Sequence, residues 1–186
     1  MPFVETGIPG LLVFEPRVFP DSRGYFYESY NADVFSKQGI KLNFVQDNQS
    51  RSTYGVIRGL HFQNPPCAQA KLVRAIVGTI LDVAVDIRVG SPTYGKVYTI
   101  ELSAENKKQL MIPAGFAHGF SVLSEIAEVM YKCDAYYNKQ SEGGICYNDP
   151  TLNIDWKIPA DKAVVSEKDL LNKPLKEQKS SFIFEG

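Results

Sequence analysis

The stretch LVRAIVGTILDVAVDIRVG, residues 72–90, is rich in valine and isoleucine and is divided by Gly78. This composition is typical of β-strands, and the glycine separates two of them, at residues 72–78 and 79–90. In the second strand, aliphatic residues alternate with polar or small ones, which is the period of two that a strand produces. Two aspartates interrupt its apolar run, which is also too short to span a bilayer. The stretch therefore predicts a pair of strands in a globular protein.

Further strand patterns follow this pair along the chain. They occupy residues 96–106, 108–115, 117–124 and 127–137. Turn sequences such as GSP, PAG and NDP recur about every ten residues between them, as in β-sandwiches and barrels. Eight or more short strands favour an all-β fold, specifically a closed double-sheet jelly roll, whose interior commonly holds a small ligand.

Helix signals are scarce. Residues 31–40 predict a short helix with Asn31 as its N-cap, and residues 165–175 predict another that Pro174 ends. The chain of 186 residues shows no internal repeat, low-complexity tract or linker. Its length suits one well-buried domain, so we expect a single domain over residues 1–186.

Charge and cysteine content exclude several classes of protein. The net charge is −1, so no overall basic field attracts nucleic acid or an anionic membrane. The N-terminus lacks the basic and apolar regions of a signal peptide. Cys67, Cys133 and Cys146 are odd in number and irregularly spaced, which fits neither a disulfide framework nor a zinc site. We therefore expect a soluble, reduced, cytoplasmic protein.

A polar strand stands out among the apolar ones. In RGLHFQNPP, residues 58–66, Leu60 and Phe62 alternate with His61 and Gln63. With a regular pleat, Arg58 lies three residues before His61 and therefore on the opposite face. The strand either has a face in water or lines a polar pocket.

The faces of two other strands indicate a pocket. Tyr131 shares its strand face with small or apolar residues, whereas the alternate positions are charged. Lys71 shares its face with Val73, Ala75 and Val77. Both Tyr131 and Lys71 are therefore expected to point inward, and a buried lysine and tyrosine near a histidine form a candidate active site.

Ordered motifs over most of the chain add a family resemblance. They are EPRVFPDSRGYFYESY (15–30), FVQDNQS (44–50), VIRGLHFQ (56–63), KLVRAIVGTILDVAVDIR (71–88), LSAENKKQLMIPAGFAHGF (102–120), YKCDAYYN (131–138), SEGGICYNDP (141–150) and SEKD (166–169). In them the chain resembles the dTDP-4-dehydrorhamnose 3,5-epimerase family. The resemblance implies a cupin-type jelly roll, a homodimer, and neither a metal nor an organic cofactor.

Two histidines without clustered carboxylates agree with the expected absence of a metal. Metal-binding members of the wider cupin group present two histidines and a carboxylate from one strand pair, whereas this chain has His61, Gln63 where a second ligand would stand, and a distant His118. Such a set is a poor site for zinc, manganese or iron.

The resemblance also implies roles in catalysis. In a dTDP-4-keto-6-deoxyhexose the hydrogens on C3 and C5 are both α to the carbonyl, so a base, a cation at the developing O4 oxyanion and an acid on the opposite face suffice. His61 matches the base and Asp169 the carboxylate that orients it. Lys71 matches the cation at O4, and Tyr131 matches the acid that reprotonates C5.

Substrate binding is implied for a larger set. Arg23 and Arg58 match the arginines that hold the pyrophosphate. Gln46 and Asn48 lie two apart, so they share a strand face and can both donate to phosphate or sugar oxygens. The remaining matched positions are Glu28, which matches a thymidine-contacting position of the family, together with Asp47, His118, Glu142 and Lys168. In the family the segment from Arg23 to Glu28 enters the neighbouring subunit's pocket.

Each of these residues also has a purely structural interpretation. A lone strand histidine usually makes structural hydrogen bonds, Tyr131 could pack in the core, Lys71 could extend from a strand end to water, and SEKD could simply begin a helix capped by Ser166. At the level of function, the alternatives are a single-site 3- or 5-epimerase of another dTDP-deoxysugar and a non-catalytic nucleotide-sugar-binding cupin. The presence of the base, its carboxylate, the cation and the acid favours the 3,5-epimerase.

Overall fold

The computed structural model describes residues 2–178 and 180–185. Its strands are β1 (Phe3–Glu5), β2 (Leu12–Phe14), β3 (Phe19–Asp21), β4 (Gly24–Phe26), β5 (Gln46–Thr53), β6 (Val56–Gln63), β7 (Lys71–Val77), β8 (Thr79–Asp86), β9 (Val97–Ser103), β10 (Gln109–Ile112), β11 (Phe116–Val122), β12 (Ile126–Cys133), β13 (Glu142–Gly144) and β14 (Val164–Val165). Its helices are α1 (Ala32–Lys37) and α2 (Glu167–Leu170), with 3₁₀ turns η1 (Lys139–Ser141), η2 (Ala160–Lys162) and η3 (Leu175–Glu177).

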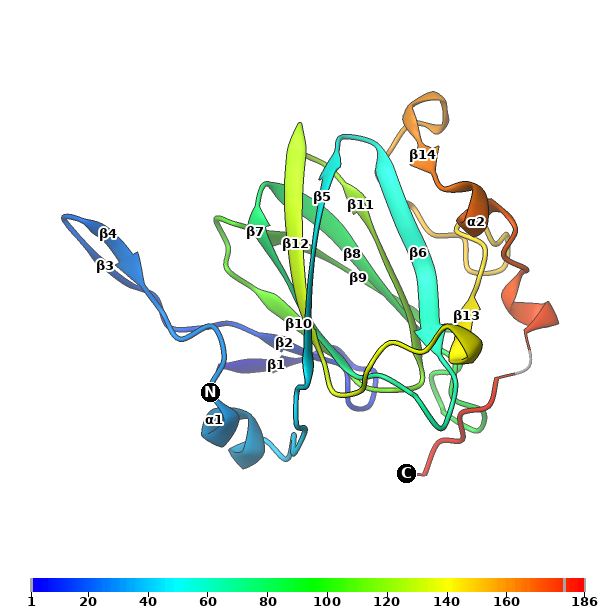
Figure 1. Cartoon of the computed structure of the whole chain (residues 1–186), viewed down its shortest axis with the longest axis horizontal. Helices are drawn as coiled ribbons and strands as arrows, with labels where there is room; N and C mark the ends of the chain where they lie inside the picture. The colour runs from blue at the N-terminus through cyan, green and yellow to red at the C-terminus, as the bar shows by residue number, and fades with distance from the viewer. Residues whose placement is uncertain (1, 179, 186) are drawn as a thin grey trace.

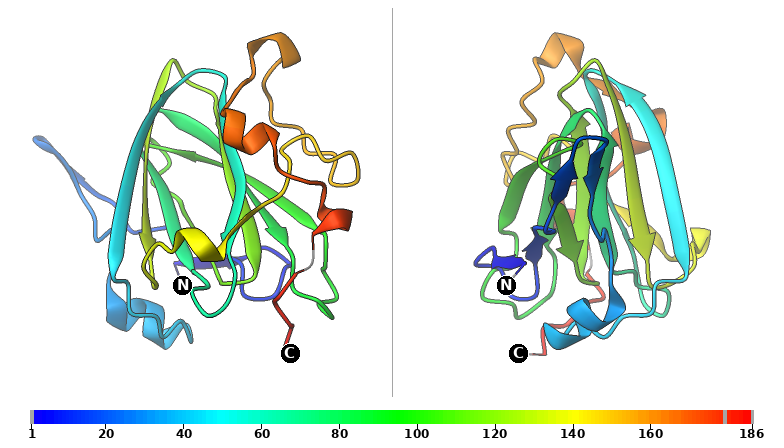
Figure 2. Two further views of the ribbon diagram at one scale, coloured as in Figure 1. Left: turned by 45° about the vertical axis from the view of Figure 1, so that its right-hand side comes forward. Right: turned by 90° about the vertical axis from the view of Figure 1, so that its left-hand side faces the viewer.

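Two sheets face each other (Figures 1 and 2). One has the strand order β1-β2-β10-β7-β12-β5, and the other has the order β13-β6-β11-β8-β9, with β14 parallel to β6. The remaining pairs within these two sheets are antiparallel. The expected all-β, double-sheet architecture is confirmed.

Strand β8, from the stretch that predicted the fold, is buried on both faces. Ile80 and Ala84 pack in the core between the sheets. Val83 and Val85 point to the outer face, where Trp156 and the segments that follow β12 cover them. A strand covered on both sides needs apolar residues at nearly every position, which explains its composition. The two aspartates of this strand face inward as well and are fully buried.

The two predicted helices form, but the second is shorter than expected. Asn31 caps α1, and its side chain accepts hydrogen bonds from the N–H groups of Asp33 and Val34. Helix α2 ends at Leu170, well before Pro174, because Lys173 instead pairs with Ile145 in a β-bridge. None of the helices in the described part of the chain is long and apolar enough to cross a membrane.

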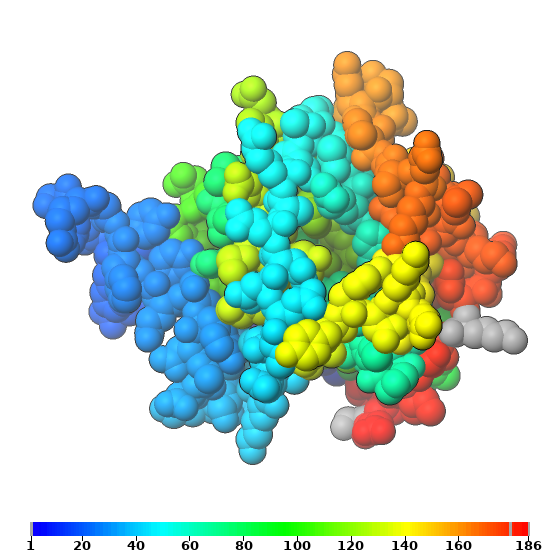
Figure 3. All heavy atoms as spheres, viewed as in Figure 1, coloured from blue at the N-terminus to red at the C-terminus, as the bar shows by residue number. Residues whose placement is uncertain are grey.

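Strands β3 and β4 form a separate two-stranded arm. It projects from the rest of the molecule in Figures 1 and 3. The side chains of Phe19, Tyr25 and Phe26 are largely exposed on it. A two-stranded ribbon with no core of its own is only marginally stable in water.

Candidate active site

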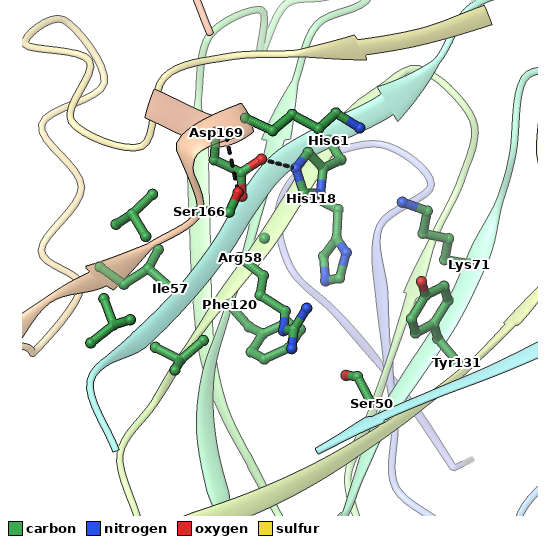
Figure 4. A pocket seen from close by; sticks show the side chains of 15 residues that line it. Ser50, Ile57, Arg58, His61, Lys71, His118, Phe120, Tyr131, Ser166 and Asp169 are labelled. Carbon is green, nitrogen blue, oxygen red and sulfur yellow. Dashed lines mark hydrogen bonds and ion pairs between the residues drawn. The ribbon is translucent and has the colours of Figure 1, made fainter. Parts of the chain in front are cut away.

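A cavity of about 510 Å³ lies between the two sheets. Its polar lining comes from strands far apart in the sequence: β6 contributes Arg58 and His61, β7 contributes Lys71, β11 contributes His118 and β12 contributes Tyr131. Figure 4 shows these side chains converging on one space. A smaller cavity of about 150 Å³ shares three of these residues and continues the site. The polar strand β6 therefore lines a pocket.

Arg58 and His61 both line the cavity, so the expectation that they occupy opposite faces is wrong. In the pairing of β11 with β6, His118 lies opposite His61 and Phe120 lies opposite Arg58. The four residues 58–61 of β6 thus lie opposite the three residues 118–120 of β11, which is a β-bulge. The extra residue shifts the alternation by one position and turns Arg58 inward beside His61.

His61 is hydrogen-bonded to a buried carboxylate. Its Nε2 lies 2.6 Å from Oδ1 of Asp169, which leaves Nδ1 as the second ring nitrogen. Oδ2 of Asp169 accepts a hydrogen bond from the Gly59 N–H at 3.3 Å. Burial by itself raises the pKa of Asp169, but the hydrogen bonds from His61 and Gly59 outweigh it and hold that pKa below its ordinary value. Asp169 is therefore an anion that can orient and stabilise a charged imidazole.

The SEKD segment both begins a helix capped by Ser166 and supplies the carboxylate that contacts His61, the two interpretations given from sequence. The Ser166 hydroxyl accepts a hydrogen bond from the Asp169 N–H and caps α2. The Asp169 side chain, however, is directed to His61 and Gly59. The helix start thus places the carboxylate beside the imidazole.

Lys71 and Tyr131 lie together on the opposite wall of the cavity from His61 (Figure 4). Lys71 Nζ is 5.9 Å from the centroid of the Tyr131 ring. Burial lowers the pKa of Lys71, an effect that nearby negative charges, including Asp82 and Glu142, partly offset. Burial raises the pKa of the Tyr131 hydroxyl although Arg58 opposes it, so the phenol holds its proton near neutral pH. The expected inward direction of both side chains is confirmed.

Asp82 is a site residue that the sequence analysis missed. It is fully buried, and its Oδ1 lies 2.8 Å from Nε2 of His118. His118 is far from His61 in sequence but directly opposite it in the sheet. The available signal was an aspartate in the middle of an otherwise apolar buried strand, a position at which a charge needs a partner.

The smaller cavity contains the predicted amide pair. Gln46 Nε2 donates to Asn48 Oδ1 at 3.0 Å, and both line this cavity as their shared strand face predicts. Tyr137, another residue that the sequence analysis missed, donates from its hydroxyl to Glu142 at 3.2 Å. Lys168 donates to the same Glu142 carboxylate at 2.5 Å and links the two cavities at their rim.

Three predicted binding residues lie outside both cavities. Asp47 points to the outer face of its sheet and forms an ion pair with Lys132 at 3.0 Å. Arg23 is exposed on the β3–β4 arm and contacts Asp21 of the same arm. Glu28 lines a different depression, of about 450 Å³, at the root of the arm. Their substrate contacts stay predictions.

Among the residues that the structure describes, no three His, Cys, Asp or Glu side chains converge as metal ligands would. The two histidines are each engaged by an aspartate through Nε2.

Comparison with known proteins decides the family. Residues 5–177 match the family model described as dTDP-4-dehydrorhamnose 3,5-epimerase. The chain belongs to this epimerase family. It is 54% identical to the dTDP-4-dehydrorhamnose 3,5-epimerase of Shigella flexneri over 171 residues, which is 91% of this chain and 93% of the relative.

Solved structures of epimerases agree. The dTDP-4-dehydrorhamnose 3,5-epimerase of Elizabethkingia anophelis superposes with a TM-score of 0.91 at 53% identity, covering 95% of this chain and 97% of that one. The dTDP-6-deoxy-D-glucose-3,5-epimerase of Legionella pneumophila, in complex with dTDP-4-keto-L-rhamnose, has a TM-score of 0.91 at 48% identity, covering 95% and 94%. The resemblance, the cupin-type jelly roll and the isomerase function predicted from sequence are confirmed.

Proposed function

We propose that the protein inverts C3 and C5 of dTDP-4-dehydro-6-deoxy-D-glucose to give dTDP-4-dehydro-L-rhamnose, one enolate at a time. The observation that carries this proposal is the placement of His61 on one wall of the cavity and Tyr131 on the other. A sugar ring held between them meets a base on one face and an acid on the other. Removal of a proton from one face and delivery to the opposite face is inversion.

Proton abstraction is the task of His61. With Nε2 hydrogen-bonded to Asp169, the Nδ1 nitrogen is the one free to accept a proton from carbon. The Asp169 carboxylate then stabilises the imidazolium that forms. The electrons of the broken C–H bond move into the enolate, whose charge develops on O4.

Lys71 serves as the cation for that charge. It is positioned on the wall opposite His61, in a cavity where a charge–charge contact is stronger than in water. Tyr131 then donates its phenolic proton to C5 from the far face, and its raised pKa keeps that proton available. At C3 a solvent water supplies the proton on the far face, and the proton that His61 gives up neutralises the hydroxide that remains. The tyrosinate recovers a proton and His61 releases one, so the enzyme returns to its starting state.

The nucleotide is held by the remaining polar residues. We assign the pyrophosphate to Arg58, together with Gln46 and Asn48, and further substrate contacts to His118, Glu142 and Lys168. No metal or organic cofactor is required by this chemistry, since the carbonyl itself acidifies both hydrogens. The three free cysteines support a cytoplasmic location, and a single domain over residues 1–186 stays a prediction.

We further propose a homodimer in which the arm of each subunit completes the site of the other. Arg23 and Glu28 lie outside the cavity of their own chain. The arm that carries Arg23 also exposes Phe19, Tyr25 and Phe26, which need a surface to cover them. A second copy of the chain, related by two-fold symmetry, supplies that surface twice.

The test is proton NMR of wild-type enzyme with dTDP-4-keto-6-deoxyglucose in D2O. We expect both the C3 and C5 proton signals to be lost and the product of the L configuration to accumulate. Loss of one signal together with a product inverted at one carbon would establish the single-site epimerase instead. Binding without any exchange would establish the non-catalytic sugar-binding alternative.

A further inference from the structure

The inward face of β5 is polar along its whole length. Its side chains are Gln46, Asn48, Ser50 and Ser52, and the intervening residues are exposed. The first three line the cavities, whereas Ser52 does not. Ser52 is nevertheless only 7% exposed. A buried hydroxyl next to a binding site needs a reason for its position.

Ser52 contacts a cavity residue. Its Oγ accepts a hydrogen bond of 3.1 Å from Nε of Arg58. The two residues come from different sheets, and the bulge in β6 brings Arg58 into reach. Ser52 therefore binds the Nε edge of the guanidinium without itself lining the cavity that Arg58 lines.

The rest of the guanidinium is free. Within residues 2–178 and 180–185, Arg58 has no carboxylate partner and its two terminal nitrogens make no hydrogen bond to protein. A guanidinium presents its donors as a planar fork that matches the oxygens of a phosphate. With Nε engaged by Ser52, the free edge of that fork faces the cavity.

We propose that Ser52 is a positioning residue that fixes Arg58 for binding the diphosphate of the nucleotide sugar. The inference rests on the proposed role of Arg58 and adds a residue that does not itself touch substrate. Arginine has several rotatable bonds, and freezing them on binding costs affinity. The Ser52 hydroxyl holds the side chain in place before substrate arrives, so the effect belongs to ground-state binding rather than to proton transfer.

The experiment compares Ser52→Ala with wild type by steady-state kinetics and by calorimetric titration with dTDP. We expect KM for the substrate and Kd for dTDP to rise about three- to tenfold, because Arg58 loses one hydrogen bond that positions it, with kcat within about twofold. Ser52→Thr keeps the hydroxyl and should restore both values. Thr53→Ala removes a hydroxyl from the adjacent, outward-facing position and should match wild type.

A double-mutant cycle with Arg58→Lys separates this inference from the role of Arg58. Lysine lacks Nε, so Ser52→Ala should cause no further loss of dTDP affinity in that background. An equal loss there, or unchanged dTDP binding by Ser52→Ala while Arg58→Lys weakens it, would overturn the role of Ser52. Unchanged dTDP binding by Arg58→Lys itself would instead overturn the assignment of Arg58 to the diphosphate. A fall in kcat and in Tm together would show that Ser52 only stabilises the fold.

Discussion

His61 depends on Asp169 for its orientation and for the stability of its charged form. The contact of 2.6 Å joins a half-exposed imidazole to a carboxylate that is nearly fully buried. We expect His61→Ala to abolish exchange at both carbons, because one base serves both; a general base is worth about 10²–10⁴-fold. Asp169→Asn should reduce both exchanges in parallel but less severely. The measurement is deuterium uptake at C3 and C5 by NMR, and normal uptake at either carbon in His61→Ala would refute the assignment.

In the proposed mechanism, Tyr131 acts at C5 only. Deprotonation requires His61 and Lys71, so Tyr131→Phe should still exchange the C3 proton with solvent. Inversion at C5 should fall steeply, because the enolate is then reprotonated on the His61 face, the same face from which the proton was removed. Time courses of the C3 and C5 signals in D2O check this, with Tyr98→Phe as the control at a tyrosine outside both cavities. If Tyr131→Phe still formed the doubly inverted sugar at the wild-type rate, the C5 proton would come from another group and Tyr131 would only pack in the core.

Asp82 is expected to set the pH range of activity through Lys71. Burial lowers the pKa of Lys71, and the charge of Asp82 partly opposes this shift. Lys71 is needed as a cation, so activity falls as the pH rises through its lowered pKa. Asp82→Asn removes a charge that raises this pKa, and the loss of activity should therefore begin at a lower pH.

The Asp82→Asn experiment measures kcat against pH from neutral to alkaline conditions. Asp155→Asn makes the same substitution at an exposed carboxylate and should leave the profile unchanged. Because the pKa of Tyr131 is raised, the loss of activity that its ionisation causes begins above the ordinary tyrosine pKa. It therefore does not mask the change caused by Lys71. An alkaline limb that stays in place or moves to higher pH would contradict the coupling.

At the scale of elements, the antiparallel pairing of β6 with β11 determines where the side chains of Arg58 and His61 point. A Cβ on Gly119 would lie 2.6 Å from the Arg58 carbonyl oxygen and 3.1 Å from the Gly59 Cα. The two glycines let the strands approach closely at the bulge. The bulge then directs Arg58 and His61 into one cavity.

Gly119→Ala should therefore damage both stability and activity. The added methyl pushes β6 away and costs about 1–3 kcal/mol, as overpacking does. It also displaces Arg58 and His61, so kcat/KM should fall more than the loss of folded protein explains. Urea unfolding and kinetics measure the two effects. Gly39→Ala has a φ of +88° and open space around it, so it should cost about 1–2 kcal/mol of stability while leaving kcat/KM unchanged.

At the scale of the whole molecule, the arm predicts that two chains share each site. Mixing Arg23→Ala with His61→Ala subunits by co-refolding should restore activity, because a mixed dimer has one site with an intact base and an intact arm. Random pairing gives ~25% of wild-type activity. His61→Ala mixed with Asp169→Asn is the control, since both residues belong to one chain's cavity, and it should show no activity beyond that of Asp169→Asn itself. Equal behaviour of the two mixtures would refute the shared site.

The sequence by itself determined the features that depend on local patterns. Alternation of period two predicted the strands and the inward direction of Lys71 and Tyr131, because a regular pleat fixes which face each side chain occupies. Asn31 and Ser166 capped the helices as predicted, since N-capping involves neighbouring residues only. Ordered motifs also indicated the epimerase family and therefore its chemistry.

The tertiary structure alone decided what depends on pairing between distant strands. The bulge between β6 and β11 placed Arg58 beside His61, against the regular pleat. The same pairing placed His118 beside His61, and it was the neighbouring strand β8 that supplied Asp82. Asp47 faces outward, as the alternation of its strand requires, but its ion-pair partner Lys132 comes from the neighbouring strand β12. Period two predicts faces within a strand, whereas register, bulges and ion pairs depend on which strand lies alongside, and that follows from the packing of the whole chain.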